Sequence, residues 1–270
     1  MSTAAERDYL LGTDEEELRR LQAQHNTWRP ETADLWERAE FSTGQAILDL
    51  GCGPGFTSLE LAERVGAEGL VLAVDGSPKF ADFLRYRAAS AGLQQVEVEV
   101  ADVRTLDLPV ASMDAAFARW LFCFIEEPQG VIERVARVLR TGGRLVVVDY
   151  CAYGAFVARI EHPHLRRVLE AVHESFGDRL EIGGKLPELM ARCGLEVEEV
   201  VPIGGIARPG NRLWCWIEQF LRVYLPDLVV RGVLGEEECA AHWEEWQANA
   251  RDPHASIASP PMVGAIGVKG

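Results

Sequence analysis

The chain has 270 residues, with 27 Lys and Arg against 42 Asp and Glu, a formal net charge of −15. A chain this acidic repels phosphate backbones, which argues against a nucleic-acid partner. Its hydrophobic fraction of 48% is that of a globular protein with a large core, so neither disulfides nor a structural metal is needed.

The six cysteines show no Cys-x-x-Cys pair and no zinc-binding spacing, and most lie in apolar runs. This predicts buried free thiols in a reducing compartment and no metal site. No apolar run approaches the roughly 18 residues of a membrane span, and the N-terminus lacks the apolar segment of a signal peptide. We therefore expect a cytoplasmic protein without membrane contact, as a monomer or homodimer.

The first 45 residues predict a helical cap. Apolar and aromatic residues recur at three- and four-residue steps over residues 14–40, which is typical of a helix face. Pro30 is expected to break this run, so that a second helix follows it.

Strands and helices then alternate over residues 46–150. The apolar runs predict five strands, at residues 46–50, 70–74, 96–100, 114–118 and 144–149. Helices fill the gaps, and the one at about 128–140 is expected to stop at Gly142-Gly143. Strict alternation implies parallel strands joined by right-handed crossovers.

The strict alternation of strands and helices ends after residue 150, and residues 151–270 have a different pattern. The patterns there predict helices at 163–176, 184–193 and 236–250, strands at 196–203 and 262–268, and an aromatic segment at 213–225 that Pro226 ends. The excursion between the last two strands is interpreted as a cap. We predict an α/β protein, one structural domain overall, with a mostly parallel seven-stranded sheet, helices on both faces and helical cap elements.

A glycine-rich loop, Asp49-Leu-Gly-Cys-Gly-Pro-Gly55, lies between the first strand and the next helix. Glycines there let the backbone turn sharply and approach a ligand closely. The dinucleotide pattern Gly-x-Gly-x-x-Gly fails at Phe56, and the Walker pattern fails because no Gly-Lys-Ser/Thr follows. Two interpretations of the loop remain: it binds another nucleoside cofactor, or it is only a tight turn between a strand and a helix.

Two carboxylates end the next two strands. Asp75 would lie beside the glycine loop, where it could accept both ribose hydroxyls, or it could only cap the following helix. Asp102 could bind the amino group of an adenine, and the backbone N–H of Val103 could donate to the adenine ring. Alternatively, Asp102 could belong to a surface turn.

Together these motifs resemble class I S-adenosylmethionine-dependent methyltransferases. The matching segments, in the family's order, are Ile47–Gly55, Val74–Asp75, Ala101–Val103, Phe117–Trp120 and Leu139–Leu145. The rest of the chain is similar to a bacterial group of small-molecule methyltransferases in Asp8–Gly12, in the helix from Gln24 to Trp28 and in Trp214–Trp216.

The resemblance implies a Rossmann-like core at 46–150 that binds S-adenosyl-L-methionine and releases S-adenosyl-L-homocysteine. The glycines would lie against the methionine part, Asp49 would organise the loop, and residues after the fourth strand would form the floor of the methyl-transfer pocket. The implied cofactor-binding residues are Asp49, Gly51, Cys52, Gly53, Gly55, Asp75, Gly76, Ser77, Asp102, Val103, Arg119, Trp120 and Trp28.

The expected partner is a small methyl acceptor with an apolar or aromatic body, because aromatic residues are frequent outside 46–150. An oxygen or nitrogen acceptor must lose a proton, and the weak candidates for this step are His162, His164 and Tyr153. The alternative for the two histidines is a lid or surface position, and the alternative for Tyr153 is ordinary core packing. The accepting atom, O, N or C, stays open, as do methylation of RNA or protein and a catalytically inactive binding module.

Overall fold

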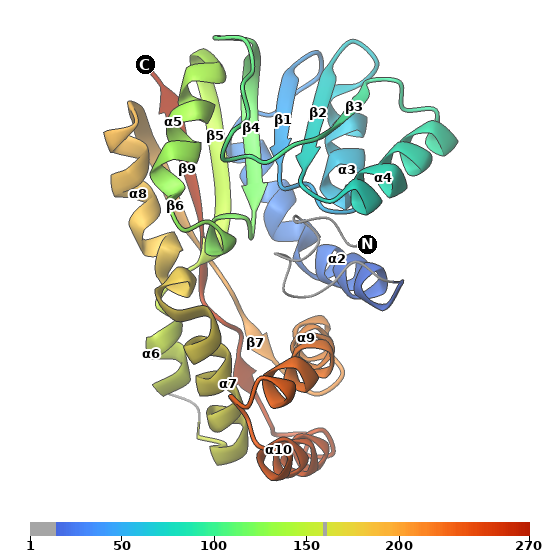
Figure 1. Cartoon of the computed structure of the whole chain (residues 1–270), viewed down its shortest axis with the longest axis vertical. Helices are drawn as coiled ribbons and strands as arrows, with labels where there is room; N and C mark the ends of the chain where they lie inside the picture. Colours follow the sequence, from blue (N-terminus) through green and yellow to red (C-terminus); the bar gives the residue numbers. More distant parts are fainter. Residues whose placement is uncertain (1–14, 159–160) are drawn as a thin grey trace.

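The computed structural model describes residues 15–158 and 161–270, so the segment Asp8–Gly12 lies outside the described residues. It shows one open seven-stranded sheet in the order β3-β2-β1-β4-β5-β9-β6 (Figure 1). The strands are β1 (Ala46–Leu50), β2 (Leu70–Asp75), β3 (Val96–Val100), β4 (Met113–Arg119), β5 (Leu139–Tyr150), β6 (Leu195–Ile203) and β9 (Met262–Lys269). The first five are mutually parallel, and β9 runs antiparallel between β5 and β6. The predicted fold class is confirmed.

The register of the parallel strands brings their carboxyl ends level. Leu50 pairs with Val74 on one side and with Ala118 on the other, and Asp75 pairs with Val100. The loops that follow β1, β2, β3 and β4 therefore meet at one edge of the sheet, which is where open α/β sheets bind ligands.

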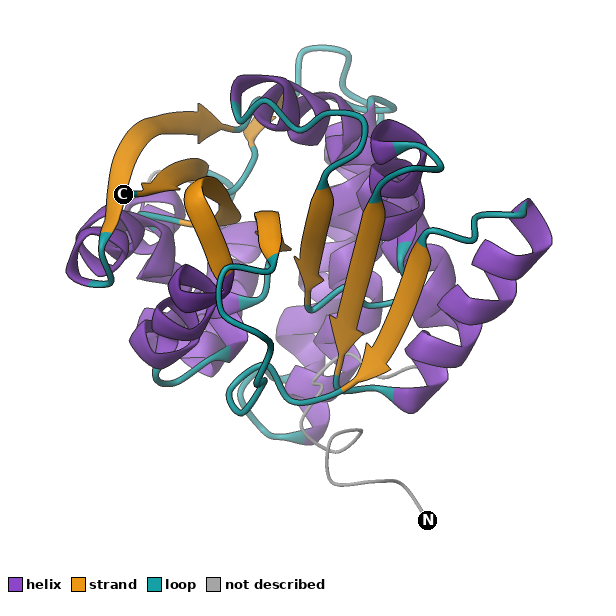
Figure 2. Cartoon of the chain, turned by 90° about the horizontal axis from the view of Figure 1, so that it is seen from above, coloured by secondary structure: helices purple, strands orange, loops and turns teal. Residues whose placement is uncertain are grey.

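Helices flank the sheet on both sides (Figure 2). Helices α3 (Phe56–Val65) and α4 (Pro78–Ala91) pack against β1, β2 and β3. Helices α5 (Pro128–Val138) and α8 (Ile182–Arg192) pack against the half that contains β5, β9 and β6. The buried strands are continuous apolar runs because both of their faces are covered.

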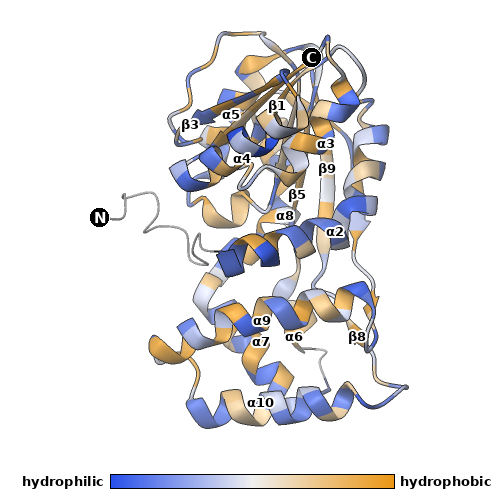
Figure 3. Ribbon diagram, turned by 90° about the vertical axis from the view of Figure 1, so that its right-hand side faces the viewer, coloured by the Kyte–Doolittle hydropathy of each residue, from blue (hydrophilic) through white to orange (hydrophobic). Residues whose placement is uncertain are grey.

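A layer of helices lies beyond the carboxyl ends of the strands. It contains α6 (Tyr153–Ala158), α7 (Pro163–Phe176), α9 (Arg212–Val230) and α10 (Glu236–Asn249), with the short turns η1 (Phe122–Phe124) and η2 (Gly177–Glu181) and the ribbon of β7 (Ile206–Ala207) and β8 (Ile257–Ala258). Helix α2 (Glu15–Arg38) lies between this layer and the sheet and packs on α9, as Figures 1 and 3 both show.

Three predicted boundaries are wrong. Helix α2 is continuous through Pro30, and α9 runs past Pro226 to Val230. Proline removes one backbone hydrogen bond, and burial of Trp28, Leu35 and Trp36 on the same helix outweighs that loss in α2. Helix α5 ends at Val138, before the two glycines, because Leu139 already adopts extended backbone and starts β5.

The cysteines differ from expectation in burial. All six are free, as predicted, but only Cys52 and Cys123 are buried, and Cys215 is exposed. Among the described helices, none combines the length and the apolar character needed to cross a membrane.

One buried histidine joins α10 to α7. His242 is fully buried against the rings of Trp243 and Trp246, and neither of its ring nitrogens has a hydrogen-bond partner among the described residues. Burial lowers the pKa of His242 to about 4, and the neighbouring His164 acts in the same direction. The imidazole is therefore neutral in the folded protein.

This burial predicts a pH-dependent stability. As pH falls from the ordinary histidine pKa of 6.5 to about 4, His242 becomes protonated in the unfolded chain but stays neutral in the folded protein. The free energy of unfolding therefore decreases through this range. We expect the burial of His242 to lower the wild-type free energy of unfolding by about 3 kcal/mol between pH 7 and pH 4, and we expect His242→Leu to lack this contribution. Urea unfolding at each pH measures both. The exposed His254→Leu should keep the wild-type profile, and parallel curves for all three proteins would contradict the assignment.

Candidate active site

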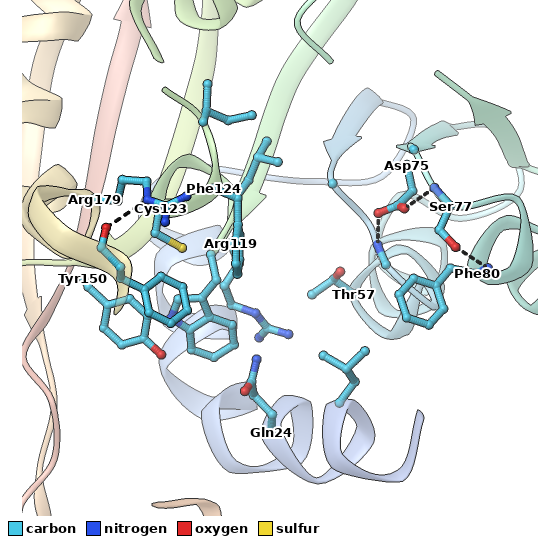
Figure 4. Close-up of a pocket in the computed structure, with 18 of the residues that line it drawn as sticks. Gln24, Thr57, Asp75, Ser77, Phe80, Arg119, Cys123, Phe124, Tyr150 and Arg179 are labelled. Atoms are coloured by element: carbon cyan, nitrogen blue, oxygen red, sulfur yellow. Dashed lines mark hydrogen bonds between the residues drawn. The ribbon is translucent and has the colours of Figure 1, made fainter. Parts of the chain in front are cut away.

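A cavity of about 650 Å³ opens between the carboxyl ends of the strands and the helical layer (Figure 4). Its volume is typical of a small-molecule site. At one end it is lined by the glycine loop and the residues that follow β2 and β3. At the other it is lined by aromatic and apolar side chains, which include Trp120, Tyr150, Tyr153, Phe176, Trp216 and Phe220. We call these the glycine-loop end and the aromatic end.

The three glycines of the loop have different tasks. Gly51, Gly53 and Gly55 all have φ between 55° and 79°, which favours glycine. A Cβ on Gly55 would collide with Leu84 of α4, and one on Gly51 would lie 2.8 Å from Leu121. A Cβ on Gly53 would meet nothing within 4 Å, and Gly53 lines the cavity. Gly53 is therefore the loop glycine that has open space on the side of the cavity.

Asp49 holds the loop onto α3. Its buried carboxylate accepts hydrogen bonds from the hydroxyls of Ser58, at 2.5 Å, and Thr57, at 3.1 Å. Burial raises the pKa of Asp49 to about 6, while these hydroxyls and the charge of Arg119 oppose the rise. The side chain lines the glycine-loop end, so it both organises the loop and presents negative charge to it.

Asp75 joins the loop to the end of β2. Its two oxygens accept the backbone N–H groups of Gly53 and Ser77, each at 2.8 Å. The N-cap of α4 is Ser77, whose hydroxyl accepts the N–H of Phe80, so Asp75 is not that cap. Burial raises the pKa of Asp75. Each carboxylate oxygen keeps acceptor capacity for a ligand hydroxyl.

Asp102 lies at the end of β3 with a charged partner that the sequence analysis missed. Its carboxylate accepts two side-chain N–H groups of Arg104 and the backbone N–H of the same residue, at 2.7–3.0 Å. This arginine lowers the pKa of Asp102. Asp102, Val103 and Arg104 all line the cavity, together with Gly76 and Ser77.

Arg119 lies at the end of β4 and faces α2. Its guanidinium donates to Thr32 Oγ1 at 2.9 Å and lies 3.2 Å from His25 Nδ1. Across the ring, His25 Nε2 lies 3.2 Å from Glu60. Burial lowers the pKa of Arg119 to about 10, so the side chain is still a cation at neutral pH.

Three tryptophans join α2, β4 and α9. Trp28 packs edge-on against Trp120 and Trp216, which stack on each other with centroids 6.4 Å apart. Trp120 and Trp216 line the cavity, whereas Trp28 lies behind them and does not. Cys52 and Gly55 do not line the cavity either, because they are packed inside the loop.

Gln24 presents a donor to the cavity. Its amide oxygen accepts from Arg20 at 2.8 Å and from the indole of Trp216 at 3.2 Å. Because the oxygen is occupied, the NH₂ group is the part left for a ligand, and Figure 4 shows the amide pointing from α2 into the cavity.

The structure separates the three candidates for proton transfer. Tyr153 lines the aromatic end, but His162 and His164 do not line the cavity. His162 lies at the start of α7 beside Asn249, and His164 is exposed on the same helix. A role for these two histidines as a base finds no support in the geometry. The lining residue Arg179 was also missed, because no sequence pattern marks a single arginine in a short turn.

An open sheet of this order, with a glycine loop after β1 and carboxylates at or just beyond the carboxyl ends of β1, β2 and β3, defines an α/β protein that binds a nucleoside cofactor. A family model described as a methyltransferase domain matches residues 47–143. Methyltransferase GfsG of Streptomyces halstedii is 31% identical over 221 residues, 80% of this chain and 72% of that protein. The chain therefore belongs to the class I S-adenosylmethionine-dependent methyltransferases.

Two further comparisons agree with this membership. Aklanonic acid methyltransferase DauC of Streptomyces sp. (strain C5) is 33% identical over 111 residues, 41% of this chain and 50% of that protein. A crystal structure of a SAM-dependent methyltransferase from Aquifex aeolicus superposes with a TM-score of 0.55 at 21% identity, over 70% of this chain and 92% of that one. The chain spans about half the length of some curated relatives that it matches, 47% in one case and 50% in another.

Alanine at two loop glycines should separate packing from ligand contact. Gly55→Ala should lower stability by about 1–3 kcal/mol through the collision with Leu84. Gly53→Ala should instead weaken S-adenosyl-L-methionine binding at least about tenfold, which equals about 1.4 kcal/mol. Urea unfolding and calorimetry measure the two effects. Gly142→Ala is the matched control, since Gly142 also has positive φ and open space but does not line the cavity. Equal cofactor affinity for Gly53→Ala and Gly142→Ala would contradict this division.

Proposed function

We propose that this chain transfers a methyl group from S-adenosyl-L-methionine to a small-molecule acceptor and releases S-adenosyl-L-homocysteine. The observation that carries the proposal is one continuous cavity that joins the glycine loop and its carboxylates to the aromatic end. The glycine-loop end suits the cofactor. The aromatic end leaves room for a second, largely apolar molecule.

The cofactor would lie across the ends of β1, β2 and β3. Asp75 would accept the ribose hydroxyls, and its position is fixed by the two backbone N–H groups that it binds. Asp102 and the backbone of Val103 would bind the adenine. Asp49 would lie on the side of the cofactor's ammonium group, and the backbone at Gly53 would pass close to the methionine part.

The reaction needs alignment more than chemical activation. The acceptor's electron pair forms a bond to the methyl carbon as the carbon–sulfur bond breaks. The two electrons of the broken carbon–sulfur bond stay on sulfur and neutralise the sulfonium. Holding the two reactants in line contributes on the order of 7–11 kcal/mol. An aromatic wall excludes water and suits the positive charge of the sulfonium.

The acceptor would be recognised by elements outside the central strands. The aromatic end is built by α7, α9, α6 and the end of β5, which supply Phe176, Trp216, Phe220, Tyr153 and Tyr150. These side chains favour an apolar or aromatic body. A cavity of this volume holds a small molecule, which supports a small acceptor over RNA or protein.

Two isosteric variants test the cofactor site. Asp75→Asn should weaken S-adenosyl-L-methionine binding about tenfold or more, because a hydrogen bond to a charged acceptor contributes about 1.5–3 kcal/mol. Asp102→Asn should have a smaller effect, since the carboxylate of Asp102 is 41% exposed and already bound to Arg104. Calorimetry measures both, and NAD titrated in parallel should not bind. Unchanged affinity in a folded Asp75→Asn protein would remove Asp75 from the ribose site.

The acceptor class is tested with a methyl-labelled cofactor and a fractionated cell extract. We expect label in the small-molecule fraction, because the cavity has the volume of a small-molecule site. Label in RNA or protein would instead show a macromolecular acceptor, and cofactor binding without any transfer would show an inactive binding module.

A further inference from the structure

Arg179 lines the aromatic end of the cavity from the turn η2. Its Nε donates to the carbonyl of Phe176 at 2.9 Å and one Nη donates to that of Ser175 at 3.4 Å. The guanidinium carbon also lies 5.8 Å from the centre of the Phe176 ring. These contacts fix the plane of the guanidinium, yet they use only two of its five N–H donors.

No carboxylate pairs with Arg179 among the described residues. The three aspartates that line the cavity belong to the glycine-loop end, and their carboxylates are occupied there. Asp49 binds two hydroxyls, Asp75 binds two backbone N–H groups and Asp102 binds Arg104. The other lining carboxylate, Glu126, is exposed.

Arg20 is a useful contrast to Arg179. It also lines the cavity, but Glu17 binds its guanidinium through two contacts of 2.6 and 2.7 Å, so its charge is compensated within the protein. In the described part of the chain, the groups that accept hydrogen bonds from the Arg179 guanidinium are the carbonyls at the end of α7. An anion from outside would complete its coordination, which is the arrangement that guanidinium groups use for carboxylates.

Among the described residues, the side chains named for the aromatic end include no base that could remove a proton from the acceptor. None of the chain's six histidines lines the cavity that the described residues form. Burial raises the pKa of Tyr150, Tyr153 and Cys123, so these groups stay protonated at neutral pH. They can donate hydrogen bonds but do not act as bases. An acceptor that is already ionised in solution fits such a site.

We infer that the methyl acceptor is an organic acid, with an apolar or aromatic body among the aromatic side chains and a carboxylate bound by Arg179. This inference rests on the proposed function and adds the chemical class of the acceptor to it. The net charge of −15 repels an anion at long range, so the preference depends on this local cation. The competing explanation is that Arg179 only caps the C-terminal end of α7.

The test compares acids with their uncharged amides. Protein saturated with S-adenosyl-L-homocysteine is titrated with 2-naphthoate and 2-naphthamide, and with anthraquinone-2-carboxylate and its amide, by calorimetry. In the wild type at least one acid should bind at least about tenfold more tightly than its amide, as expected for a charge-assisted hydrogen bond. In Arg179→Gln this ratio should fall to within about twofold. Arg179→Lys should keep part of the preference because it keeps the charge.

Arg222→Gln is the matched control, because Arg222 lies on α9 beside Trp243, pairs with Glu218 and does not line the cavity. It should keep the full ratio. A pure capping role would lower the melting temperature of Arg179→Gln and leave the ratio unchanged, which would overturn the inference. Acids that bind no better than their amides in the wild type, or that do not bind at all, overturn it as well, whether or not the variants fold.

The same experiment keeps the two proposals apart. If S-adenosyl-L-homocysteine binds but no acid is preferred, only the acceptor class is wrong. If S-adenosyl-L-homocysteine does not bind, the proposed function itself fails, and the acceptor inference fails with it.

Discussion

The arrangement of the site depends on how the half-buried cation of Arg119 is bound at the end of β4. A charge out of water is costly unless other groups solvate it, and here the groups that do so come from a different part of the chain. Thr32 and His25 both lie on α2. The other ring nitrogen of His25 contacts the carboxylate of Glu60 on α3. The end of β4 is thereby tied to α2. Because α2 carries Gln24, which lines the cavity, and Trp28, which packs behind Trp120 and Trp216, this tie also places one wall of the cavity.

The cavity separates charge along its length. Its carboxylates gather at the glycine-loop end, which is where a sulfonium cofactor with an ammonium group would bring positive charge. The far end has aromatic rings, protonated phenols and an arginine without a carboxylate partner in the described chain. Such a division favours two different ligands, one at each end. It would also keep the negative charge of the acid acceptor inferred above away from Asp49 and Asp75, which would repel it.

The tryptophans have two different roles, packing between elements and lining the cavity, and their positions in the structure decide which role each one has. Trp28, Trp36 and Trp246 are buried in the packing between elements, with indole nitrogens that lack a partner among the described residues. Trp120 and Trp216 have an indole N–H that reaches an acceptor, Met262 Sδ and Gln24 Oε1 respectively, and both line the cavity. The first group stabilises the cap, and the second shapes the space for a ligand.

The sequence alone determined the sheet, the glycine loop and the strand-end carboxylates. These are local features: continuous apolar runs, a turn that favours glycine, and acidic residues at or near the carboxyl ends of strands. Because parallel strands end at one edge, their order along the chain already places Asp49, Asp75 and Asp102 near one another. The continuity of α2 and α9 was decided by tertiary packing, which outweighs the hydrogen bond that each proline removes.

Only the tertiary structure decided which side chains face the second ligand. Arg179 and Gln24 are separated by 155 positions, and no spacing rule links a turn after α7 to the N-terminal helix. His162 and His164 lie outside the cavity because the start of α7 carries them away from it, toward α10. Residues that bind through long-range contacts leave no periodic signal, since their neighbours in space are set by the packing of whole helices rather than by neighbours in the chain.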